Sequence, residues 1–381
     1  MARKNSILFI NPDYHCTFLY KDKLRSMGWK ADIYVAPEYP TKMLFSEEDI
    51  ISFKSEKYGL YTARFFYILW LFFKIRRYKY IFFYGRPGKI SFSLFPKILG
   101  KNIKTLNFFL EIKICKLFNK KIIYLPSGCR DDYSKQSFFK FDNGRVCSNC
   151  GIFSVCNDNN NNIYFKLMRK NADLIIGQGF FEKSEFSLLN ISWKSIDLEL
   201  WHPNLAIPER WPKLKKTEKT ILILHSTALE NRKVDPKNIK GSHALVEAVG
   251  KLKNEGFDCQ LEIISGVPSN EMKFYQAQAD IIVDQLIYGS WGSTTIESLA
   301  LGKPTICYIR PEWKRFYLET FKLDELPIIE ADIDTIYDVL KQLITNTDHL
   351  EEISQKSRSF AESMFDVNLN VDKLIAALQT L

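Results

Sequence analysis

Short apolar runs alternate with longer amphipathic segments along most of the chain, a pattern typical of strands followed by helices. In the first half, the apolar runs that predict strands are 7–10, 31–35, 80–84, 122–125 and 173–177. The segments that predict helices are 17–28, 61–77 and 106–118. Because strands that alternate with helices form parallel sheets, this half predicts an α/β domain.

The second half repeats the alternation, with strands expected at 220–224, 260–264, 280–283 and 304–308. Helices are expected at 242–253, 271–278 and 291–301, and further helices continue to the C-terminus. We therefore expect two Rossmann-like doubly wound domains that face each other across a cleft. The first spans 1–200, a linker with three prolines spans 201–219, and the second spans 220–364. The last segment, 365–381, is expected to form a helix that packs back on the first domain.

The composition agrees with two folded domains. The chain has 381 residues, of which 46% are hydrophobic and 25% charged, so a mainly disordered chain is excluded. The longest uninterrupted apolar run, 65–73, has nine residues, whereas a membrane-spanning helix needs about 20. No secretory leader is recognisable at the N-terminus. We therefore expect a cytoplasmic protein, in which the eight cysteines are reduced.

The positive charge is concentrated in one segment. The formal net charge of the chain is +9, but residues 51–121 contain 16 Lys and Arg against two Asp and Glu. The same segment holds 19 of the 54 aromatic residues. A basic, aromatic-rich surface suits an anionic partner such as phospholipid, nucleic acid or an anionic glycan. A solvated basic face over an ordinary core is the alternative interpretation.

Several common enzyme motifs are missing from the sequence. It contains no G-x-x-x-x-G-K-[ST] loop of P-loop nucleotidases and no G-x-S-x-G nucleophile elbow. The first expected strand is followed by Asn-Pro-Asp-Tyr-His at 11–15 and not by G-x-G-x-x-G, which disfavours a dinucleotide dehydrogenase.

The residues that suggest chemistry lie between 221 and 310. Gly292 precedes an expected helix, so the amides of Ser293, Thr294 and Thr295 would face an anion at the positive end of that helix. Lys240, just before another helix, would add a cation for the same diphosphate. Glu297 follows Ser293 by one helical turn, and its carboxylate suits a ribose diol. This set predicts a nucleotide-diphosphate site at the carboxyl ends of parallel strands.

Three further residues extend this predicted site. His225 ends the first strand of the second half, where it is either a site residue or a buried core histidine. Gly266 and Gly289 are expected, with Gly292, to line the nucleotide. A plain Rossmann-like lobe, in which the glycines only make turns, is the alternative.

These motifs together resemble the retaining GT-B glycosyltransferases of the group often called glycosyltransferase family 4. The matching stretches are Lys240-Gly241, 279–285, the pair Gly289 and Gly292, and 297–304. In that family, the first glutamate of an E-x7-E pair contacts the donor sugar and the second contacts the ribose. Glu297 matches the second glutamate, whereas Gly289 stands in place of the first. The resemblance also implies an arginine beside the lysine, for which Arg232 is the candidate, and a reaction that needs no metal cofactor.

The resemblance implies that the first half of the chain binds the acceptor. Asp13 and His15 follow the first strand, where each is a candidate to orient an acceptor hydroxyl or to act as a general base. For Asp13, a cap of the following turn or helix is the competing interpretation.

Four cysteines form a second local signal. Cys129, Cys147, Cys150 and Cys156 have the spacing C-x17-C-x2-C-x5-C, which suits a closed, structural Zn²⁺ site in the first domain. Such a site would hold together a polar loop that has little apolar content of its own. Reduced thiols without metal, an iron–sulfur cluster and disulfides remain open alternatives.

We therefore expect a retaining glycosyltransferase that moves a sugar from a nucleotide-diphospho-sugar to a glycan or lipid-linked hydroxyl in bacterial surface polysaccharide assembly. The basic aromatic segment predicts peripheral contact with the anionic inner face of the plasma membrane, through Trp70, Phe72, Phe73 and the residues 74–77. Nucleic acid is not the expected partner. Two alternatives stay open: a GT-B epimerase that acts on the nucleotide sugar, and a nucleic-acid-binding protein with a zinc knuckle.

Overall fold

The structure divides into two compact units. Unit 1 comprises Met1–Ser134, Asn157–Trp193 and Val367–Leu381, and unit 2 comprises Lys135–Cys156 and Lys194–Asp366. The computed structural model describes residues 5–13, 15–36, 49–53, 55–85, 110–126, 142–151, 153–156, 166–176, 188–189, 193–214, 217, 219–227 and 237–381.

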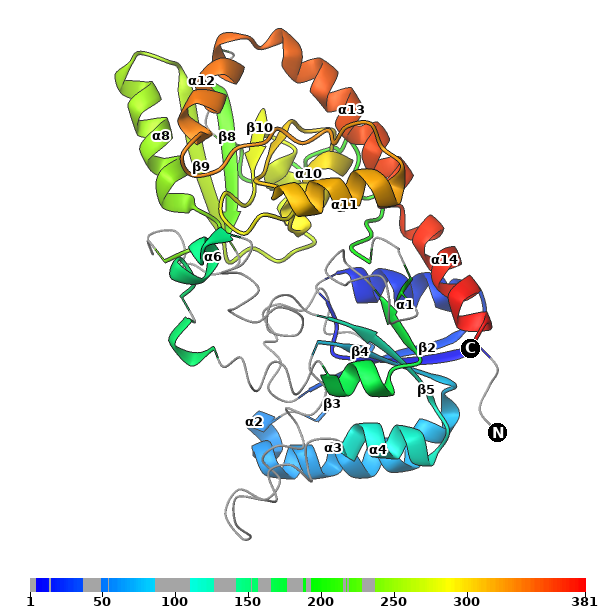
Figure 1. Ribbon diagram of the computed structural model, residues 1–381. Helices are drawn as coiled ribbons and strands as arrows, with labels where there is room; N and C mark the ends of the chain where they lie inside the picture. The colour runs from blue at the N-terminus through cyan, green and yellow to red at the C-terminus, as the bar shows by residue number, and fades with distance from the viewer. Residues whose placement is uncertain are drawn as a thin grey trace. The chain divides into compact units, whose positions relative to one another are not determined.

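Unit 1 is built on a seven-stranded parallel sheet (Figure 1). Its strands are β1 (Ser6–Ile10), β2 (Lys30–Val35), β3 (Ile50–Ser52), β4 (Tyr80–Tyr84), β5 (Lys121–Leu125), β6 (Leu174–Ile176) and β7 (Leu188–Leu189). Their order across the sheet is β3-β2-β1-β4-β5-β6-β7. The central strands are apolar on both faces, as expected of a parallel sheet that is covered on both sides.

Helices cover both faces of this sheet (Figure 1). On one face, α1 (Cys16–Ser26) and α14 (Val367–Gln379) pack over residues such as Phe9 and Phe82. On the other face, α3 (Leu60–Lys74) and α4 (Leu110–Leu117) pack over residues such as Leu8 and Ile81. The alternation of neighbouring strand residues between two cores follows from the two-residue period of a strand. Unit 1 also contains the short elements α2 (Ser55–Tyr58) and the 3-10 helix η2 (Ile75–Arg77).

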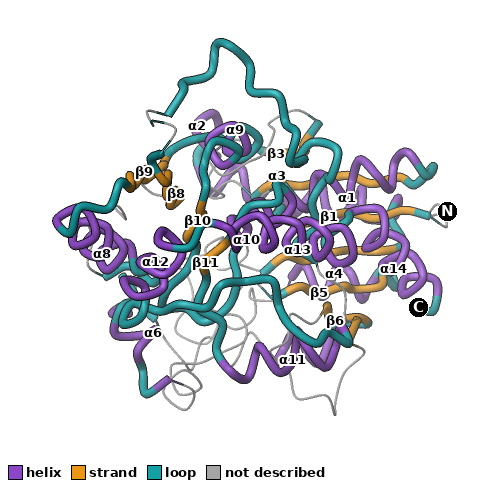
Figure 2. The backbone as a smooth tube through the Cα atoms, turned by 90° about the horizontal axis from the view of Figure 1, so that it is seen from above, coloured by secondary structure: helices purple, strands orange, loops and turns teal. Residues whose placement is uncertain are grey.

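Unit 2 is built on a four-stranded parallel sheet in the order β11-β10-β8-β9. The strands are β8 (Ile221–Thr227), β9 (Cys259–Ser265), β10 (Ile281–Val283) and β11 (Thr305–Ile306). One core packs α8 (Ser242–Asn254) and α12 (Ile336–Thr345) together against the sheet, and these two helices run side by side in Figures 1 and 2. The other elements are α6 (Arg145–Ser148), η6 (Phe153–Val155), α9 (Met272–Gln276), α10 (Ser293–Ala300), α11 (Pro311–Phe321) and α13 (Asp348–Met364).

The mixed α/β class with two parallel sheets is confirmed, and each expected strand is present within a few residues of its predicted bounds. The predicted helix 291–301 begins later, at Ser293, because Trp291 belongs to the preceding turn. The short strands β3 and β7 were not predicted. The segment that carries Cys147 groups with unit 2, whereas the C-terminal helix α14 enters the core of unit 1 through Val371 and Leu374.

The apolar helix α3 was the strongest candidate for a membrane span by sequence. It has 15 residues, and within the described parts of the chain no helix combines the length and the hydropathy that crossing a membrane requires.

Candidate functional site

Strand order marks one position in unit 2 where a ligand crevice forms. The chain leaves β8 toward β9 on one side and leaves β10 toward β11 on the other, although β8 and β10 are neighbours. Loops that diverge from adjacent parallel strands open a crevice at the carboxyl ends of those strands. Here β8 ends in His225, Ser226 and Thr227, and β10 is followed directly by Asp284.

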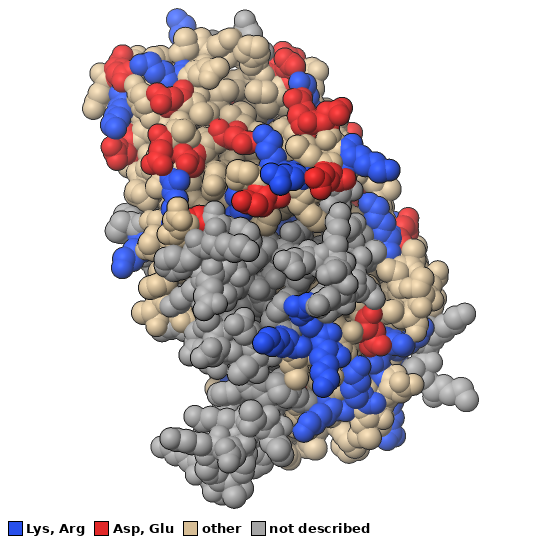
Figure 3. Space-filling model, in the orientation of Figure 1, with Lys and Arg blue, Asp and Glu red and all other residues tan. Residues whose placement is uncertain are grey.

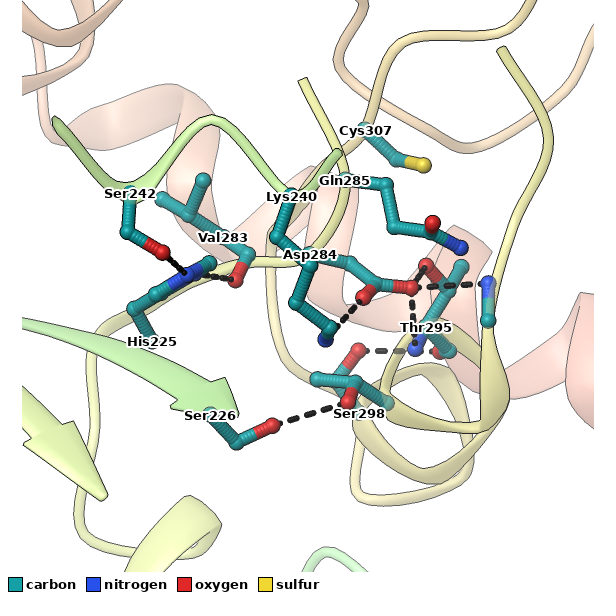
Figure 4. Close-up of polar contacts among 12 residues, drawn as sticks. His225, Ser226, Lys240, Ser242, Val283, Asp284, Gln285, Thr295, Ser298 and Cys307 are labelled. Atoms are coloured by element: carbon teal, nitrogen blue, oxygen red, sulfur yellow. Dashed lines mark hydrogen bonds and ion pairs between the residues drawn. The ribbon is translucent and has the colours of Figure 1, made fainter. Parts of the chain in front are cut away.

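Asp284 is the centre of the polar contacts at this position (Figure 4). Its side chain is fully buried. One oxygen, Oδ1, accepts a hydrogen bond from Lys240 Nζ at 2.8 Å. The other, Oδ2, accepts from the Gly292 amide at 2.8 Å, the Thr295 hydroxyl at 2.8 Å and the Thr295 amide at 3.3 Å. Burial opposes ionisation, but the Lys240 charge and these hydrogen bonds hold the pKa of Asp284 below its usual value, so it is a carboxylate at neutral pH.

Lys240 is held by its backbone as well as by its side chain. Its amide donates to Asn238 Oδ1 at 3.0 Å, and its carbonyl accepts from the Leu286 amide at 3.0 Å. Gly241 follows with a φ of +75° and starts α8. The side chain of Lys240 is 14% exposed, and its ammonium pairs with Asp284. The residue predicted to be the cation of the site therefore lies at the β8–β10 crevice and already faces a carboxylate.

His225 is fully buried, and both of its ring nitrogens are bonded (Figure 4). Nδ1 lies 2.8 Å from the Val283 carbonyl, which only accepts, so Nδ1 carries the proton. Nε2 then accepts from the Ser242 hydroxyl at 2.8 Å. Burial, helped by the Lys240 charge, lowers the pKa of His225 to about 4. The predicted site residue is thus a neutral histidine with neither nitrogen open to a substrate, and it ties β8 to β10 and α8.

Asp284 accepts hydrogen bonds from only some of the backbone amides at the beginning of α10. The amides of Gly292 and Thr295 donate to that carboxylate. The amides of Ser293 and Thr294 have no acceptor among the residues that the structure describes. Ser293 is half-buried. The predicted phosphate-binding turn therefore keeps two donors, and the Thr295 amide, which we expected to face the ligand, faces Asp284 instead.

Glu297 lies one turn into α10, as predicted, and is nearly buried at 5% exposure. Its Oε2 accepts from Gln276 Nε2 of α9 at 2.9 Å. Burial raises the pKa of Glu297 to about 7, and the negative charge of Asp284 adds to this, while the Gln276 hydrogen bond acts in the opposite direction. A carboxyl with this pKa changes its charge near neutral pH.

Gly289 and Trp291 shape the turn before α10. Gly289 has a φ of +82°, and a Cβ there would lie 2.8 Å from Arg310 Nε, so both conformation and space require glycine. Arg310 is buried and donates to the Tyr288 carbonyl at 2.6 Å. Trp291 stacks on Tyr317 of α11 with ring centroids 3.8 Å apart. Position 289, where the resemblance implied a glutamate, is therefore packed against a guanidinium.

Gly266 lies just beyond the carboxyl end of β9, with a φ of +68°. No heavy atom lies within 4 Å of the point where its Cβ would be. Its requirement for glycine is therefore conformational.

In unit 1, the equivalent divergence of loops lies between β1 and β4, because the chain leaves β1 toward β2 and β4 toward β5. Asp13 and His15 follow β1 at this position, and both are nearly buried. The Asp13 amide donates to the Thr17 hydroxyl at 2.8 Å, and its carbonyl accepts from the Thr17 amide at 3.4 Å. The backbone of Asp13 thus closes the first turn of α1, while a role of its side chain, as a cap or toward an acceptor, stays a prediction.

Two predicted residues, Arg232 and Cys129, lie outside the described residues. Across the described parts of the chain, no three His, Cys, Asp or Glu side chains are arranged to hold a metal ion, so Cys147, Cys150 and Cys156 do not form the predicted zinc site by themselves. Because the fourth ligand, Cys129, is not among the described residues, the zinc site stays a prediction. Ion pairs also hold this segment. Arg145 donates to Asp332 at 3.0 Å and to Asp334 at 2.9 Å, at the end of unit 2 that precedes α12.

Sequence reasoning missed the residues that organise the site. Asp284 was noted only as part of a matching stretch, although a charged residue directly after a buried strand was a usable signal. Ser226, whose hydroxyl lies 2.8 Å from that of Thr294, carried no signal beyond its place at a strand end. Gln276 carried none, because its partner Glu297 lies 21 residues away in the chain. Asn238 carried none either, although its partners Lys240 and Ser242 are close in sequence.

Comparison with known proteins identifies the fold. No family model matches the chain, and no curated protein does. Among solved structures, HepE from Anabaena in complex with UDP-glucose has a TM-score of 0.60 at 11% identity, over 99% of this chain and 100% of that one. WaaG, a glycosyltransferase involved in lipopolysaccharide biosynthesis, has a TM-score of 0.57 at 11% identity, over 98% and 99% of the two chains.

A third structure, from Listeria monocytogenes and assigned as a UDP-N-acetylglucosamine 2-epimerase, has a TM-score of 0.54 at 11% identity. The match covers 99% of this chain and 96% of that one. At this level of identity the likeness concerns the path of the chain. These matches extend over nearly the whole length of the protein, and both of its units are parallel α/β sheets. The chain therefore has the GT-B type of fold.

Proposed function

We propose that the protein is a retaining glycosyltransferase that transfers a sugar from a nucleotide-diphospho-sugar to a hydroxyl of a glycan or lipid-linked acceptor. The observation that carries this proposal is that the Lys240 ammonium and the start of α10 bind the same carboxylate, that of Asp284, while the amides of Ser293 and Thr294 have no acceptor among the described residues. A cation beside the positive end of a helix suits a diphosphate. The UDP-glucose bound by HepE, which shares the fold, supports the same ligand class.

In this proposal, each residue of unit 2 acts on one part of the donor. Lys240 and the amides of Ser293 and Thr294 stabilise the diphosphate as charge grows on it during departure. Glu297 accepts hydrogen bonds from the ribose diol. Asp13 and His15 of unit 1 orient the acceptor hydroxyl, and Arg232 remains a predicted second cation. Fixed charges and dipoles supply the stabilisation that a divalent metal supplies in other transferases.

The test is a thermal-shift and calorimetric screen of the full chain against UDP, GDP and their glucose and mannose derivatives. A ligand that binds only the folded protein raises its melting temperature. We expect a nucleoside diphosphate to bind and the corresponding monophosphate to bind at least tenfold more weakly, because the second phosphate is the one that contacts Lys240. Equal affinity for mono- and diphosphate, or no binding of either, would refute the proposal.

We also propose that the acceptor is reached at an anionic lipid surface, in the assembly of bacterial surface polysaccharide. The helix α3 exposes five large apolar side chains, with Phe65 and Phe73 at 51% and 65% exposure; the others are Phe66, Leu69 and Phe72. Lys74 and the exposed Arg76 and Arg77 follow at its C-terminal end. Apolar side chains beside cations suit the interface of an anionic membrane. In Figure 3, the described Lys and Arg of unit 1 gather with few acidic neighbours.

One expected anchor differs in the structure. Trp70 is half-buried and stacks near Tyr34, with ring centroids 5.7 Å apart, so it belongs to the core beneath α3. Phe65, which we had not singled out, is exposed in its place. The role in lipopolysaccharide biosynthesis of WaaG, which shares the fold, supports the pathway class.

Sedimentation with phosphatidylglycerol vesicles tests the surface. We expect Phe65→Ser/Phe73→Ser to lower the partition coefficient by at least tenfold, since burying each side chain contributes roughly 1.5–3 kcal/mol. The matched control is Val246→Ser, which removes an exposed apolar side chain of α8 in unit 2. An equal loss in both variants, or binding to neutral vesicles with the same strength, would contradict an anionic lipid surface as the partner.

A second candidate, a nucleotide-sugar epimerase, is favoured by one observation. Position 289 is glycine where the related transferases carry a sugar-contacting glutamate, and the protein from Listeria monocytogenes that shares the fold is assigned as an epimerase. Incubation with UDP-N-acetylglucosamine alone separates the candidates. Formation of a stereoisomer of the intact nucleotide sugar supports the epimerase, whereas release of UDP that depends on an added acceptor supports the transferase.

A further inference from the structure

The buried carboxylate of Asp284 accepts four hydrogen bonds, although the proposed reaction gives this residue no role. We propose that Asp284 is a positioning residue, which fixes the ammonium of Lys240 in front of α10 for the departing diphosphate. This inference rests on the proposed function and deepens it. It concerns how the cation is held and adds no second ligand.

The two oxygens of Asp284 divide their partners between two elements. Oδ1 takes the Lys240 ammonium from the loop before α8, and Oδ2 takes the Gly292 and Thr295 donors of α10. A single rigid carboxylate thus sets the distance between the cation and the helix terminus. An ammonium has three N–H donors, and among the described residues Asp284 accepts from one of them, which leaves two for an anion.

The backbone of Lys240 is fixed from the opposite side. Its amide donates to Asn238 Oδ1 at 3.0 Å, and Asn238 Nδ2 donates to the Ser242 hydroxyl at 2.8 Å. Ser242 in turn donates to His225, which donates to the Val283 carbonyl next to Asp284 in the chain. Every group in this path is buried. Both ends of the lysine are therefore held by groups attached to β8 and β10, so little ordering remains to be done when the diphosphate arrives.

Gly292 belongs to the same arrangement. Its φ of −97° is open to any residue, but a Cβ there would lie 2.8 Å from Asp284 Oδ2 and 3.1 Å from Gln285 Nε2. The glycine is thus required by the carboxylate. Gly292 leaves room for the Asp284 carboxylate, which in turn holds the Lys240 ammonium.

Because Asp284 is negatively charged, its replacement should affect nucleotide binding and turnover differently. A carboxylate beside the diphosphate repels it, and it also holds the lysine that stabilises the transition state. Asp284→Asn removes the repulsion and releases the lysine. We therefore expect the variant to bind UDP or GDP as tightly as the wild type or more tightly, while its turnover falls at least tenfold. A purely structural defect lowers binding and turnover together, in proportion to the folded fraction.

The experiment compares Asp284→Asn with Ser298→Ala, a control that removes two buried hydrogen bonds of α10, to the Thr295 carbonyl and the Thr305 hydroxyl, and no hydrogen bond to Asp284. Affinities for UDP and GDP come from calorimetry, and turnover comes from the release of nucleoside diphosphate from UDP-glucose and GDP-mannose. The control is expected to keep its turnover within twofold. In a Lys240→Ala background, Asp284→Asn is expected to cause no further loss, because it acts through the lysine.

Three results overturn the inference: turnover of Asp284→Asn equal to that of Ser298→Ala, parallel loss of binding and turnover, or a further loss on top of Lys240→Ala. If Asp284→Asn does not fold, Gly292→Ala displaces the carboxylate while keeping both charges, and it must lower turnover with binding retained. A wild type that binds neither UDP nor GDP overturns the proposed function and this inference together. A wild type that binds, with Asp284→Asn resembling the control, overturns the inference alone.

Discussion

In each of the two sheets, loops diverge from a pair of neighbouring strands, but the residues that follow those strands differ in their chemistry. In unit 1 the loops diverge between β1 and β4, and in unit 2 they diverge between β8 and β10. After β1, the backbone of Asp13 closes the first turn of α1 through Thr17. After β10, α10 begins with two open amides and an ammonium beside them. Strand order therefore determines where a site forms, and the residues that follow the strands determine what it binds.

The charges at the two positions also differ. The β8–β10 crevice presents Lys240, with its carboxylate partner buried behind it. The β1–β4 position presents Asp13 and His15, which in the proposed reaction orient the acceptor hydroxyl or exchange a proton with it. This contrast assigns the donor to unit 2 and the acceptor hydroxyl to unit 1 in the proposed reaction. Variants at each position are expected to separate donor chemistry from acceptor chemistry.

The largest expected effect is that of Lys240→Ala. Removal of the cation should lower turnover by about 10³-fold, as the loss of a key electrostatic donor does in other enzymes, and should weaken binding of the diphosphate much less. The comparison of kcat with the dissociation constant of UDP or GDP checks this. Lys240→Arg is the charge-preserving control.

Folding must be checked in the same series, because Lys240→Ala leaves Asp284 buried without its ion-pair partner. Such a loss destabilises proteins by roughly 3–5 kcal/mol. Circular dichroism and the melting temperature of the variant measure this. If a folded Lys240→Ala protein keeps the turnover of the wild type, the Lys240 ammonium does not stabilise the departing diphosphate.

Asp13→Asn tests the other side. We expect transfer to an acceptor to fall by about 10²-fold, which is typical for the loss of a group that exchanges a proton with substrate. Binding of UDP or GDP and the slow hydrolysis of the donor in the absence of acceptor should remain within twofold, since Asp13 lies in unit 1. Thr17→Val, which removes the hydroxyl that accepts from the Asp13 amide, serves as the structural control.

If Thr17→Val and Asp13→Asn lose the same amount of transfer activity, Asp13 acts only through the turn before α1. If Asp13→Asn weakens nucleotide binding, the division of donor and acceptor between the two units is wrong.

Sequence patterns predicted the fold well because each element is defined by neighbouring residues. The strand Tyr80–Tyr84 is a run of apolar residues and has the bounds that we expected. The strands β3 and β7 escaped detection because they contain three and two residues at or next to the edge of the sheet, too few to show a period. The start of α10 was misplaced because Trp291 packs on Tyr317, a contact that no local pattern reveals.

Sequence patterns predicted only those site residues whose proposed role does not depend on a partner elsewhere in the chain. Lys240 and Glu297 were recognised from their places beside helices. Asp284 was not assigned a role, because its partners Lys240 and Gly292 lie 44 and eight residues away in the chain. His225 was expected to face a substrate, yet its partners Ser242 and Val283, 17 and 58 residues away, occupy both nitrogens. Long-range hydrogen bonds decide these roles, and the sequence does not display them.

The smallest expected effect belongs to Glu297, and it appears in the pH dependence. The pKa of this buried carboxyl is raised to about 7 from an ordinary value of 4.5. The folded protein therefore favours the neutral form, so the stability contributed by Glu297 is complete below pH 4.5 and is lost as the pH rises through 7. The total is about 3 kcal/mol. Glu297→Gln has no such titration, so its melting temperature should gain on that of the wild type between pH 5 and pH 8.

Ligand binding should follow the opposite trend. An ionised Glu297 accepts hydrogen bonds from both ribose hydroxyls, whereas the protonated form accepts less well. The affinity of the wild type for UDP-glucose, whose diphosphate does not titrate in this range, should therefore rise about tenfold between pH 6 and pH 8. Glu297→Gln should bind with an affinity that does not depend on pH. A wild-type affinity that is constant across this range would show that Glu297 does not hold the ribose, and the donor side of the comparison would then rest on Lys240 and the terminus of α10 alone.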